Sequence, residues 1–351
     1  MAMDAPGITI GGRLLTLGRP ALIVAELGQN HNGSWQLAEQ LVDAAAWAGA
    51  DAIKVVKRDL ESELSRAASR RRYDSQHAFG TTYGEHRRAL ELSPATHAAI
   101  AARARRHGLL YIGTACDLPS AALLAELHVD AFKIASRDLN NLPLLRDVAR
   151  REKPLILSTG MAGFNEIDAA AEVLLQAGAA FALLQCTSLY PTPLDEAHLR
   201  SIETLARRYR VAVGFSDHTP GILLPPVAVA LGASIIEKHL TLDRSLKGTD
   251  HACSLEPDEL RQLVEHVRQV ERALGRADKP LADGIGMVRA KLGRSLVLRA
   301  PLPAGTRIEE PMLTLKCPGD GLSWLDRQTV VGRCLKRDLA ADELLTADDV
   351  I

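Results

Sequence analysis

Short apolar runs recur along the first three quarters of the chain, with helix-like stretches between them. The runs fall at residues 22–27, 52–56, 110–115, 131–135, 154–158, 181–187, 211–215 and 234–240. The Ala-, Leu- and Arg-rich stretches between them repeat apolar residues every three or four positions, as amphipathic helices do. The pattern therefore predicts about eight strand–helix units, preceded by a Gly-rich hairpin within residues 8–17.

The order of these elements predicts the fold class. Continuous apolar strands that alternate with helices indicate an α/β protein with a parallel sheet buried on both faces. Eight units over about 250 residues favour a closed (β/α)8 TIM barrel. An open Rossmann sheet is disfavoured further because no GxGxxG motif follows the first strand.

The pattern changes after the last helical stretch, which ends near residue 274. The segment RADKPLADGIGM is typical of a linker, and turn signals such as PAGT and CPGDG follow it among short strand runs. We therefore expect a barrel domain at 1–280, a linker at 281–291 and a small domain poor in helix at 292–351. Within the barrel domain, the long polar connection from residue 56 to residue 94 is expected to be functional or disordered.

Composition narrows the function class. The 351 residues are 47% hydrophobic and 24% charged, with a net charge of -1, so no bulk basic field attracts nucleic acid or an anionic membrane. The five cysteines are scattered without zinc-binding spacing, which favours a reducing compartment. The sequence has no export signal and no apolar run of about 18 residues. We expect a cytoplasmic protein that acts on small molecules.

Polar residues end nearly every predicted strand. The catalytic groups of barrel enzymes gather at these C-terminal strand ends. Lys54 and Lys133 lie inside apolar strands, and hydroxyl residues end the others. Ammonium groups and many short donors suit a small, highly anionic ligand. The alternative is that a lysine pairs with a core carboxylate and the serines merely end strands. Glu26 opens the segment AELGQNHNG, which a simple turn explains equally well.

Two histidines fall at neighbouring strand ends. His218 follows the seventh strand and His239 lies in the eighth, where period-two geometry puts Glu237 and His239 on one face and Lys238 on the other. Two histidines with carboxylates nearby and room for water suit a divalent first-row cation that acts as a Lewis acid. We predict that they are its only protein ligands, because no third histidine occupies a strand end. The alternative is that both are ordinary core or strand-end histidines.

A set of motifs extends this interpretation to a family. The motifs are AELGQNHNG, the lysine of DAIK, TTYGEHRRALE, AFKIASRDLNNLPLL, LSTGM, LQCTSLYPTP, GFSDHT, ALGASIIEKHLTLD, KGTDHACSLEP and KLGRSLVLRAPLPAGTRI. In these motifs and in their order the chain resembles the sialic acid synthase family, and the resemblance spans essentially its whole length. The tail resembles the antifreeze-like (SAF) β-clip domain shared with type III antifreeze proteins, which in this family caps the barrel mouth of the partner in a domain-swapped homodimer.

The resemblance implies a reaction and residue roles. Phosphoenolpyruvate would condense with an N-acetylmannosamine-like sugar, free or as its 6-phosphate, to give a nonulosonic (sialic-type) acid and phosphate. Mn2+ or a similar cation, such as Mg2+ or Co2+, would bind His218 and His239. The positions that bind phosphoenolpyruvate in the family are Lys54, Thr114, Lys133, Ser136, Ser158, Ser188 and Ser216. Those that handle sugar hydroxyls, metal-bound water or proton transfer are Glu26, Asp138, Tyr190, Glu237 and Asp250.

Three positions depart from the bacterial members that use N-acetylmannosamine. Those members commonly carry Glu at position 138, Asn at position 188 and, before the Pro-Gly of the capping domain, an arginine where Cys317 stands here. A thiol cannot make the bidentate contact of a guanidinium, so sugar recognition must involve other basic groups. The TYGEH and LQCTS segments are more similar to animal enzymes that use the 6-phosphate. The candidates in the small domain and its approach are Lys291, Arg294 and Lys316.

Other functions stay open at this point. One is a phosphoenolpyruvate aldol synthase that takes a different aldose, as octulosonate or heptulosonate phosphate synthases do. Another is a metal-independent Schiff-base aldolase that uses Lys54 or Lys133. A non-catalytic sugar-binding paralogue and an ice-binding tail are the alternatives outside enzymes.

Overall fold

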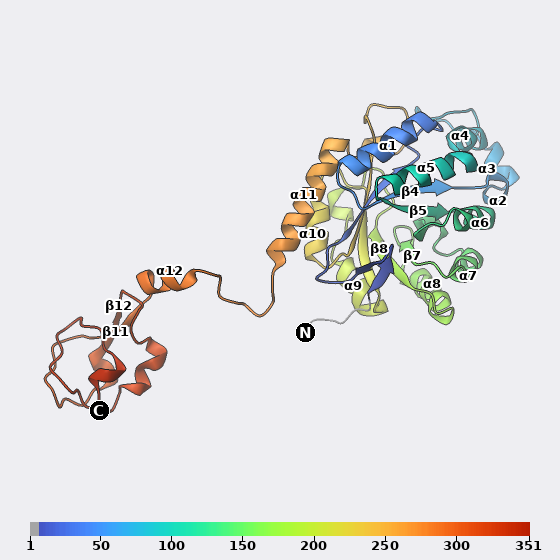
Figure 1. Cartoon of the computed structure of the whole chain (residues 1–351). Coiled ribbons are helices and arrows are strands. Elements are labelled where there is room, and N and C mark those ends of the chain that lie inside the picture. The colour runs from blue at the N-terminus through green and yellow to red at the C-terminus, as the bar shows by residue number, and fades with distance from the viewer. Residues whose placement is uncertain (1–6) are drawn as a thin grey trace. The chain divides into compact units, whose positions relative to one another are not determined.

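The computed structural model describes residues 7–351. The chain divides into two compact units, Met1–Gly275 and Arg276–Ile351, which are described separately below (Figure 1). The second unit begins at Arg276, before the predicted linker at 281–291, and most of that linker lies in helix α12 (Ile285–Leu292).

The first unit is the expected parallel barrel. Within the described residues, eight strands close into a ring in the order β10-β3-β4-β5-β6-β7-β8-β9, and each strand lies within a few residues of its predicted run. The structure therefore confirms the predicted TIM-barrel fold. The strands are β3 (Leu22–Gly28), β4 (Ala52–Lys57), β5 (Leu110–Ala115), β6 (Ala131–Ile134), β7 (Leu155–Ser158), β8 (Phe181–Cys186), β9 (Ala212–Asp217) and β10 (Ile235–His239).

Helices connect successive strands and cover the outside of the barrel (Figure 1). They are α1 (Trp35–Trp47), α5 (Pro94–Arg106), α6 (Leu118–Glu126), α7 (Leu142–Ala149), α8 (Phe164–Gln176), α9 (Ser201–Tyr209), α10 (Leu224–Ala230) and α11 (Pro257–Leu274). The long connection after β4 is folded rather than a plain loop. It contains the short helices α2 (Leu60–Glu63), α3 (Arg66–Arg70) and α4 (Tyr83–Leu90), and α4 begins with a reciprocal capping box between Thr82 and Glu85.

Two apolar clusters stabilise the barrel. One lies between the strands and the surrounding helices, and the other fills the barrel interior near the N-terminal strand ends. The interior cluster includes Ile8, Ile10 and Leu15 from the hairpin β1 (Ile8–Ile10) and β2 (Arg13–Leu15), which the sequence predicted. Each such fully buried aliphatic side chain contributes roughly 1.5–3 kcal/mol. The hairpin therefore packs into the interior core opposite the strand ends that carry the polar residues.

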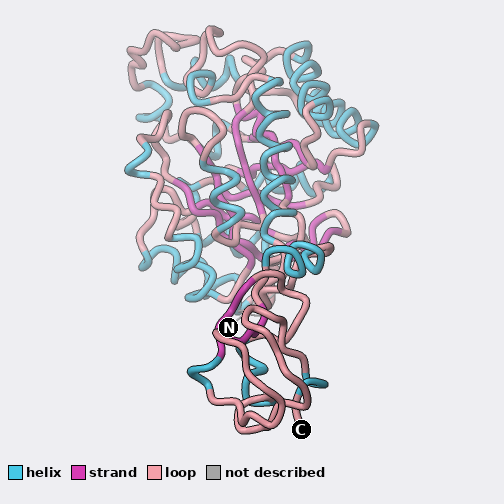
Figure 2. Tube along the Cα trace, turned by 90° about the vertical axis from the view of Figure 1, so that its left-hand side faces the viewer, coloured by secondary structure: helices cyan, strands magenta, loops and turns pink. Residues whose placement is uncertain are grey.

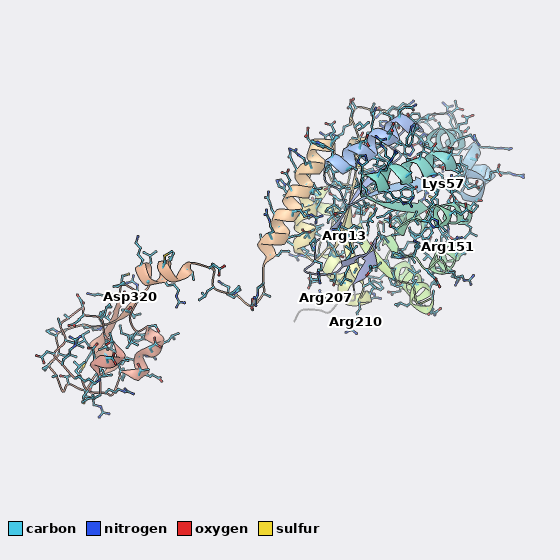
Figure 3. All side chains as sticks on the ribbon, in the orientation of Figure 1. Arg13, Lys57, Arg151, Arg207, Arg210 and Asp320 are labelled. Carbon is cyan, nitrogen blue, oxygen red and sulfur yellow. The ribbon has the colours of Figure 1, made fainter. Side chains whose placement is uncertain are left out.

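Charged side chains occupy two environments in this unit. Arg207 and Arg210, near the end of α9, are exposed, whereas Lys57 at the end of β4 is buried and pairs with Glu91 at 2.5 Å (Figure 3). Among residues 7–351, no helix combines the length and apolar character needed to cross a membrane.

The second unit is small and mostly irregular, as the extent of loop in Figure 2 shows. Its strands β11 (Ser295–Leu298) and β12 (Leu313–Lys316) pair antiparallel, and isolated bridges such as Leu302 with Leu339 join the remaining segments. A separate buried cluster that includes Leu296, Ile308 and Val350 forms its core. This agrees with the predicted small domain poor in helix.

Candidate active site

A cavity of about 600 Å³ lies at the C-terminal ends of the barrel strands. The C-terminal ends of the strands converge on one mouth, so every strand, or the loop that follows it, contributes side chains to this cavity. These side chains carry carboxylates, ammonium groups, hydroxyls and imidazoles. Most of the residues that the sequence singled out for this site line the cavity. They are Glu26, Lys54, Thr114, Lys133, Ser136, Ser158, Ser188, Tyr190, Ser216, His218, Glu237, His239 and Asp250.

Lys54 sits between two buried carboxylates. Its Nζ lies 2.7 Å from Oε2 of Glu26 and 3.0 Å from Oε1 of Glu237, and the Ser216 hydroxyl donates to the same Glu237 oxygen at 2.8 Å. Burial lowers the pKa of Lys54 to about 8 despite the attraction of Glu237. Burial opposes ionisation of Glu237, but Lys133 and Lys54 outweigh it and lower the pKa of Glu237 to about 2. Glu237 is therefore a carboxylate at neutral pH.

Lys133 is buried beside the hydroxyl-rich side of the cavity. Its Nζ donates to Oγ of Ser158 at 2.6 Å and to the Ile134 carbonyl at 3.0 Å. Ser136 accepts a hydrogen bond from the Gly160 backbone at 3.0 Å, and the buried hydroxyl of Thr114 has no partner within the described residues. A buried polar group without a partner is unfavourable, so Thr114 is suited to a bound ligand.

The two histidines approach each other at the mouth. Their ring centroids are 5.3 Å apart, and the Tyr190 ring packs 4.1 Å from that of His218. Nδ1 of His218 donates to the Thr187 carbonyl at 2.9 Å, which leaves Nε2 as the atom that can bind a cation. Nδ1 of His239 is buried and has no partner in residues 7–351. Burial lowers the pKa of His239 to about 3, so its ring is neutral at pH 7, as a metal ligand must be.

The start of the loop after β3 is packed closely against these groups. Gly28 has a φ of +51°, and a Cβ there would lie 3.2 Å from both Asp250 Oδ2 and His239 Cε1. Asn30 is buried and donates to the Leu240 carbonyl at 2.8 Å. The segment AELGQNHNG thus combines a structural turn with the placement of Glu26.

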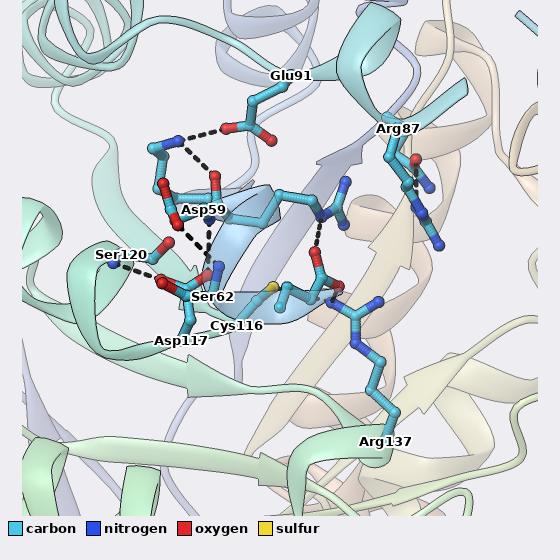
Figure 4. Close-up of polar contacts among 12 residues, drawn as sticks. Asp59, Ser62, Arg87, Glu91, Cys116, Asp117, Ser120 and Arg137 are labelled. Atoms are coloured by element: carbon cyan, nitrogen blue, oxygen red, sulfur yellow. Dashed lines mark hydrogen bonds and ion pairs between the residues drawn. The ribbon is translucent and has the colours of Figure 1, made fainter. Parts of the chain in front are cut away.

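Asp138 does not line the cavity. Its carboxylate lies 3.2 Å from Nε of Arg137, and burial raises the pKa of Asp138. Arg137 also contacts Glu63 at 2.8 Å, and Glu63 lies 3.3 Å from Nε of Arg58 (Figure 4). The structure therefore places Asp138 in an ion-pair network beside the cavity.

Sequence reasoning missed several residues that line the cavity, and they are Gln29, Arg58, His77, Arg87, Arg137, Cys186 and Thr249. The sequence could have pointed to Arg58 and Cys186, because Arg58 directly follows β4 and Cys186 is the last residue of β8. His77 and Arg87 come from the long connection after β4, where no strand periodicity predicts which side chains face the mouth.

The remaining sugar-binding candidates belong to the second unit. Lys316 forms an ion pair with Asp342, and Cys317 is exposed. Lys291 is at the end of α12, and Arg294 precedes β11.

The fold and the cavity define a class: a barrel enzyme whose strand ends bring two buried lysines and two histidines into one cavity. A family model described as the NeuB family matches residues 41–279, and one described as the SAF domain matches residues 293–351. The chain belongs to the NeuB family, carries a SAF domain, and is a synthase of the type that its relatives represent.

Relatives with different products are similarly close. The N-acetylneuraminate-9-phosphate synthase of Mus musculus is 39% identical over 89% of this chain and 86% of its own length. The N,N'-diacetyllegionaminic acid synthase of Campylobacter jejuni is 37% identical over 93% of this chain and 99% of its own. The crystal structure of N-acetylneuraminic acid synthetase from Leptospira borgpetersenii, in complex with citrate, has a TM-score of 0.71 and 34% identity over 81% of this chain and 95% of its own.

Proposed function

We propose that this chain joins phosphoenolpyruvate to the open-chain aldehyde of an amino sugar, giving a nonulosonic acid and phosphate. The observation that carries the proposal is that Lys54 and Lys133 share one cavity with a row of hydroxyls, the Glu26–Glu237 carboxylate pair and two histidines. The names of the relatives, which include N-acetylneuraminate-9-phosphate and N,N'-diacetyllegionaminic acid synthases, support a product of this class.

The anion would bind on the side of the cavity formed by β4 to β7. Lys133 and Ser158 already form a donor pair there, and the unpartnered Thr114 hydroxyl adds another group. Ammonium and hydroxyl donors are well suited to the phosphate and carboxylate oxygens of phosphoenolpyruvate. Lys54, which Glu26 and Glu237 hold in place, supplies the second positive charge.

The two histidines fit a divalent cation. The Thr187 carbonyl fixes the ring of His218 with Nε2 available, and His239 is neutral with an unpartnered Nδ1. No group of three or more His, Cys, Asp or Glu side chains in residues 7–351 has a geometry that could hold a metal. In the proposed site, His218 and His239 would hold the cation, with water or substrate as the other ligands. When bound, a cation of this kind polarises a carbonyl oxygen as a Lewis acid.

The chain's own residues account for the charge that develops on phosphoenolpyruvate. Its C3 forms a bond to the aldehyde carbon, the aldehyde oxygen takes up a proton, and C2 becomes electron-poor. The ionised Glu237, together with Glu26, can stabilise positive charge at C2. Water then adds to C2 and loses a proton, which leaves a hydroxyl on C2. This hydroxyl loses its proton and becomes the C2 carbonyl oxygen as the bond between C2 and the bridging oxygen breaks. Phosphate leaves with that oxygen and with the bonding electrons.

The test measures phosphate release from phosphoenolpyruvate that carries heavy oxygen at the bridging position. We expect release only with an amino-sugar acceptor, loss of release in chelator, and the heavy label in phosphate. Label retained in the organic product would mean that the P–O bond breaks, and the proposed chemistry would be wrong.

A Schiff-base aldolase is the second candidate, because one observation favours it. The pKa of Lys54, lowered to about 8 by burial, suits an amine that must lose its proton to attack a carbonyl. Borohydride added during turnover would trap such an adduct on Lys54 or Lys133. We expect no trapped adduct, and a covalent product on either lysine would favour this candidate over the first.

We also propose that the SAF domain completes the site in trans within a domain-swapped homodimer. The support is the family resemblance of residues 292–351 and the need to exclude water during the reaction. Full-length chains that carry His239→Ala would be mixed with full-length chains that carry Lys291→Glu and Arg294→Glu. Restored activity in mixed dimers is expected, and no restoration after proven subunit exchange would contradict the swap.

A further inference from the structure

Three arginines line the cavity in addition to the two buried lysines. They are Arg58 at the end of β4, Arg87 in α4 and Arg137 after β6. The lysines, the hydroxyls and the proposed cation already account for phosphoenolpyruvate and the aldehyde. These guanidinium groups therefore raise the question of what other anion the cavity takes.

Carboxylates neutralise two of these arginines. Glu63 lies 2.8 Å from Arg137 and 3.3 Å from Arg58, and Asp138 adds a second carboxylate 3.2 Å from Arg137. Figure 4 shows Arg137 joined to this network, with Arg87 apart from it. Arg58 and Arg137 thus have a structural role in fixing α2 against the loop after β6.

Arg87 has only neutral partners. Within the part of the chain that the structure describes, no carboxylate oxygen lies within 4.0 Å of its guanidinium, so it has no ion pair. Its Nη1 donates to Oε1 of Gln29 at 2.6 Å, and its Nε and Nη2 donate to the Tyr83 hydroxyl at 2.8 and 2.5 Å. The Tyr83 ring also packs 4.9 Å from the guanidinium carbon. The group is held in one orientation without an ion pair, and its charge is among the influences that lower the pKa of the nearby Asp250.

This arrangement is suited to an anion. A guanidinium has five N–H donors, and Arg87 uses three of them on Gln29 and Tyr83. One N–H on each terminal nitrogen is left to donate to the oxygens of a phosphate. Because the contacts to Tyr83 and Gln29 fix the side chain beforehand, little rotamer entropy is lost when a ligand binds.

The position of Arg87 points to the acceptor rather than to phosphoenolpyruvate. Its partner Gln29 directly follows Gly28, whose Cβ position is close to both Asp250 and His239. Arg87 is thus on the side of the mouth formed by the loops after β3 and β10, whereas Lys133 and Ser158 come from β6 and β7. An acceptor with its aldehyde at the histidines can extend past Asp250 toward Arg87.

We propose that Arg87 binds the phosphate monoester of a phosphorylated amino-sugar acceptor and selects it over the free sugar. This inference rests on the proposed function. Sequence identity does not decide between a phosphorylated and a free sugar. A relative named for a 9-phosphate product is 39% identical to this chain, and one named for an unphosphorylated acid is 37% identical.

The test compares N-acetylmannosamine with its 6-phosphate as acceptors for the full-length protein and three variants. Arg87→Gln removes the charge, and Arg87→Lys keeps it. Arg88→Gln is the matched control, because Arg88 is the next residue of α4, is exposed and does not line the cavity. The unmodified chain should prefer the phosphorylated sugar in kcat/KM. Arg87→Gln should lower this preference about ten- to a hundredfold, Arg87→Lys less, and Arg88→Gln not at all.

The outcomes separate the two proposals. Equal losses for both sugars in Arg87→Gln, or a preference for the free sugar in the unmodified chain, would overturn the role of Arg87. If no acceptor releases phosphate from phosphoenolpyruvate, the proposed function fails. Calorimetric binding of N-acetylmannosamine 6-phosphate then decides on Arg87: weaker binding to Arg87→Gln than to Arg88→Gln supports the role, and equal binding overturns it. Thermal unfolding of each variant checks that α4 stays folded.

Discussion

The two halves of the barrel interior have the same backbone and opposite chemistry. Near the N-terminal strand ends the inward positions are apolar, as at Ala52, Ile112, Ala131, Ile156 and Ile235. Two residues further along the same strands, the inward positions are Lys54, Thr114, Lys133, Ser158 and Glu237. The apolar half can stabilise the barrel, so the other half can hold charges that would be unfavourable in an ordinary core.

Replacing the two histidines should have the largest effect on the activity of the polar half of the barrel interior. His218→Ala and His239→Ala should each lower kcat by about a thousandfold or more if the proposed cation is lost, because its charge stabilisation acts in the transition state. Bound metal would be measured in parallel by elemental analysis, and the fold by circular dichroism. Turnover of the double variant in chelator-treated buffer would refute the metal role.

A matched pair of substitutions sharpens the comparison. Ile156→Ala creates a cavity in the apolar half and should lower the free energy of unfolding by about 2–5 kcal/mol, with little change in the KM for phosphoenolpyruvate. Lys133→Met should raise that KM about tenfold or more, because it removes a charge-assisted contact to the anion. Denaturant titration and initial rates would be measured on both variants. The comparison fails if Ile156→Ala alters KM as much as Lys133→Met does.

The pH dependence tests the charge of Lys54. Its pKa of about 8 means that kcat/KM for phosphoenolpyruvate should fall as pH rises above 8, by about tenfold per pH unit. Stability should not fall with it. The folded-state pKa lies below the usual 10.5, so between pH 8 and 10.5 the unfolded chain binds more protons, and this group's contribution to the free energy of unfolding rises with pH. A rate profile that is flat to pH 10 would contradict the assignment.

The smallest expected effect is at Gly28. Gly28→Ala places a Cβ in a left-handed conformation and 3.2 Å from His239 and Asp250. We expect a loss of about 1–2 kcal/mol in the free energy of unfolding and a severalfold lower kcat. Gly108→Ala is the control, since its φ of +73° carries the same strain but nothing lies within 4 Å of the added Cβ. Equal losses of kcat in both variants would mean that crowding at the site is unimportant.

The sequence alone determined the barrel and the chemical character of its mouth. Period-two alternation predicts that Glu237 and His239 face one side of their strand and Lys238 the other. In the structure, Lys238 lies outside the cavity and pairs with Asp217 at 2.7 Å, both fully buried. The position of Lys54 and Lys133 in the site was predictable for another reason, because a charge inside an apolar strand needs a partner or a ligand.

Only the tertiary structure decided what surrounds those residues. The Glu26–Lys54–Glu237 arrangement joins the consecutive strands β3 and β4 to β10, which is distant in the chain and becomes the neighbour of β3 only when the barrel closes. Arg87 and Arg88 are neighbours in the short helix α4, and only the packing of that helix at the barrel mouth turns Arg87 toward the cavity and leaves Arg88 exposed. Strand periodicity determines the direction of a side chain from sequence alone, whereas the charge balance around Arg87 depends on contacts between segments that only the folded chain brings together.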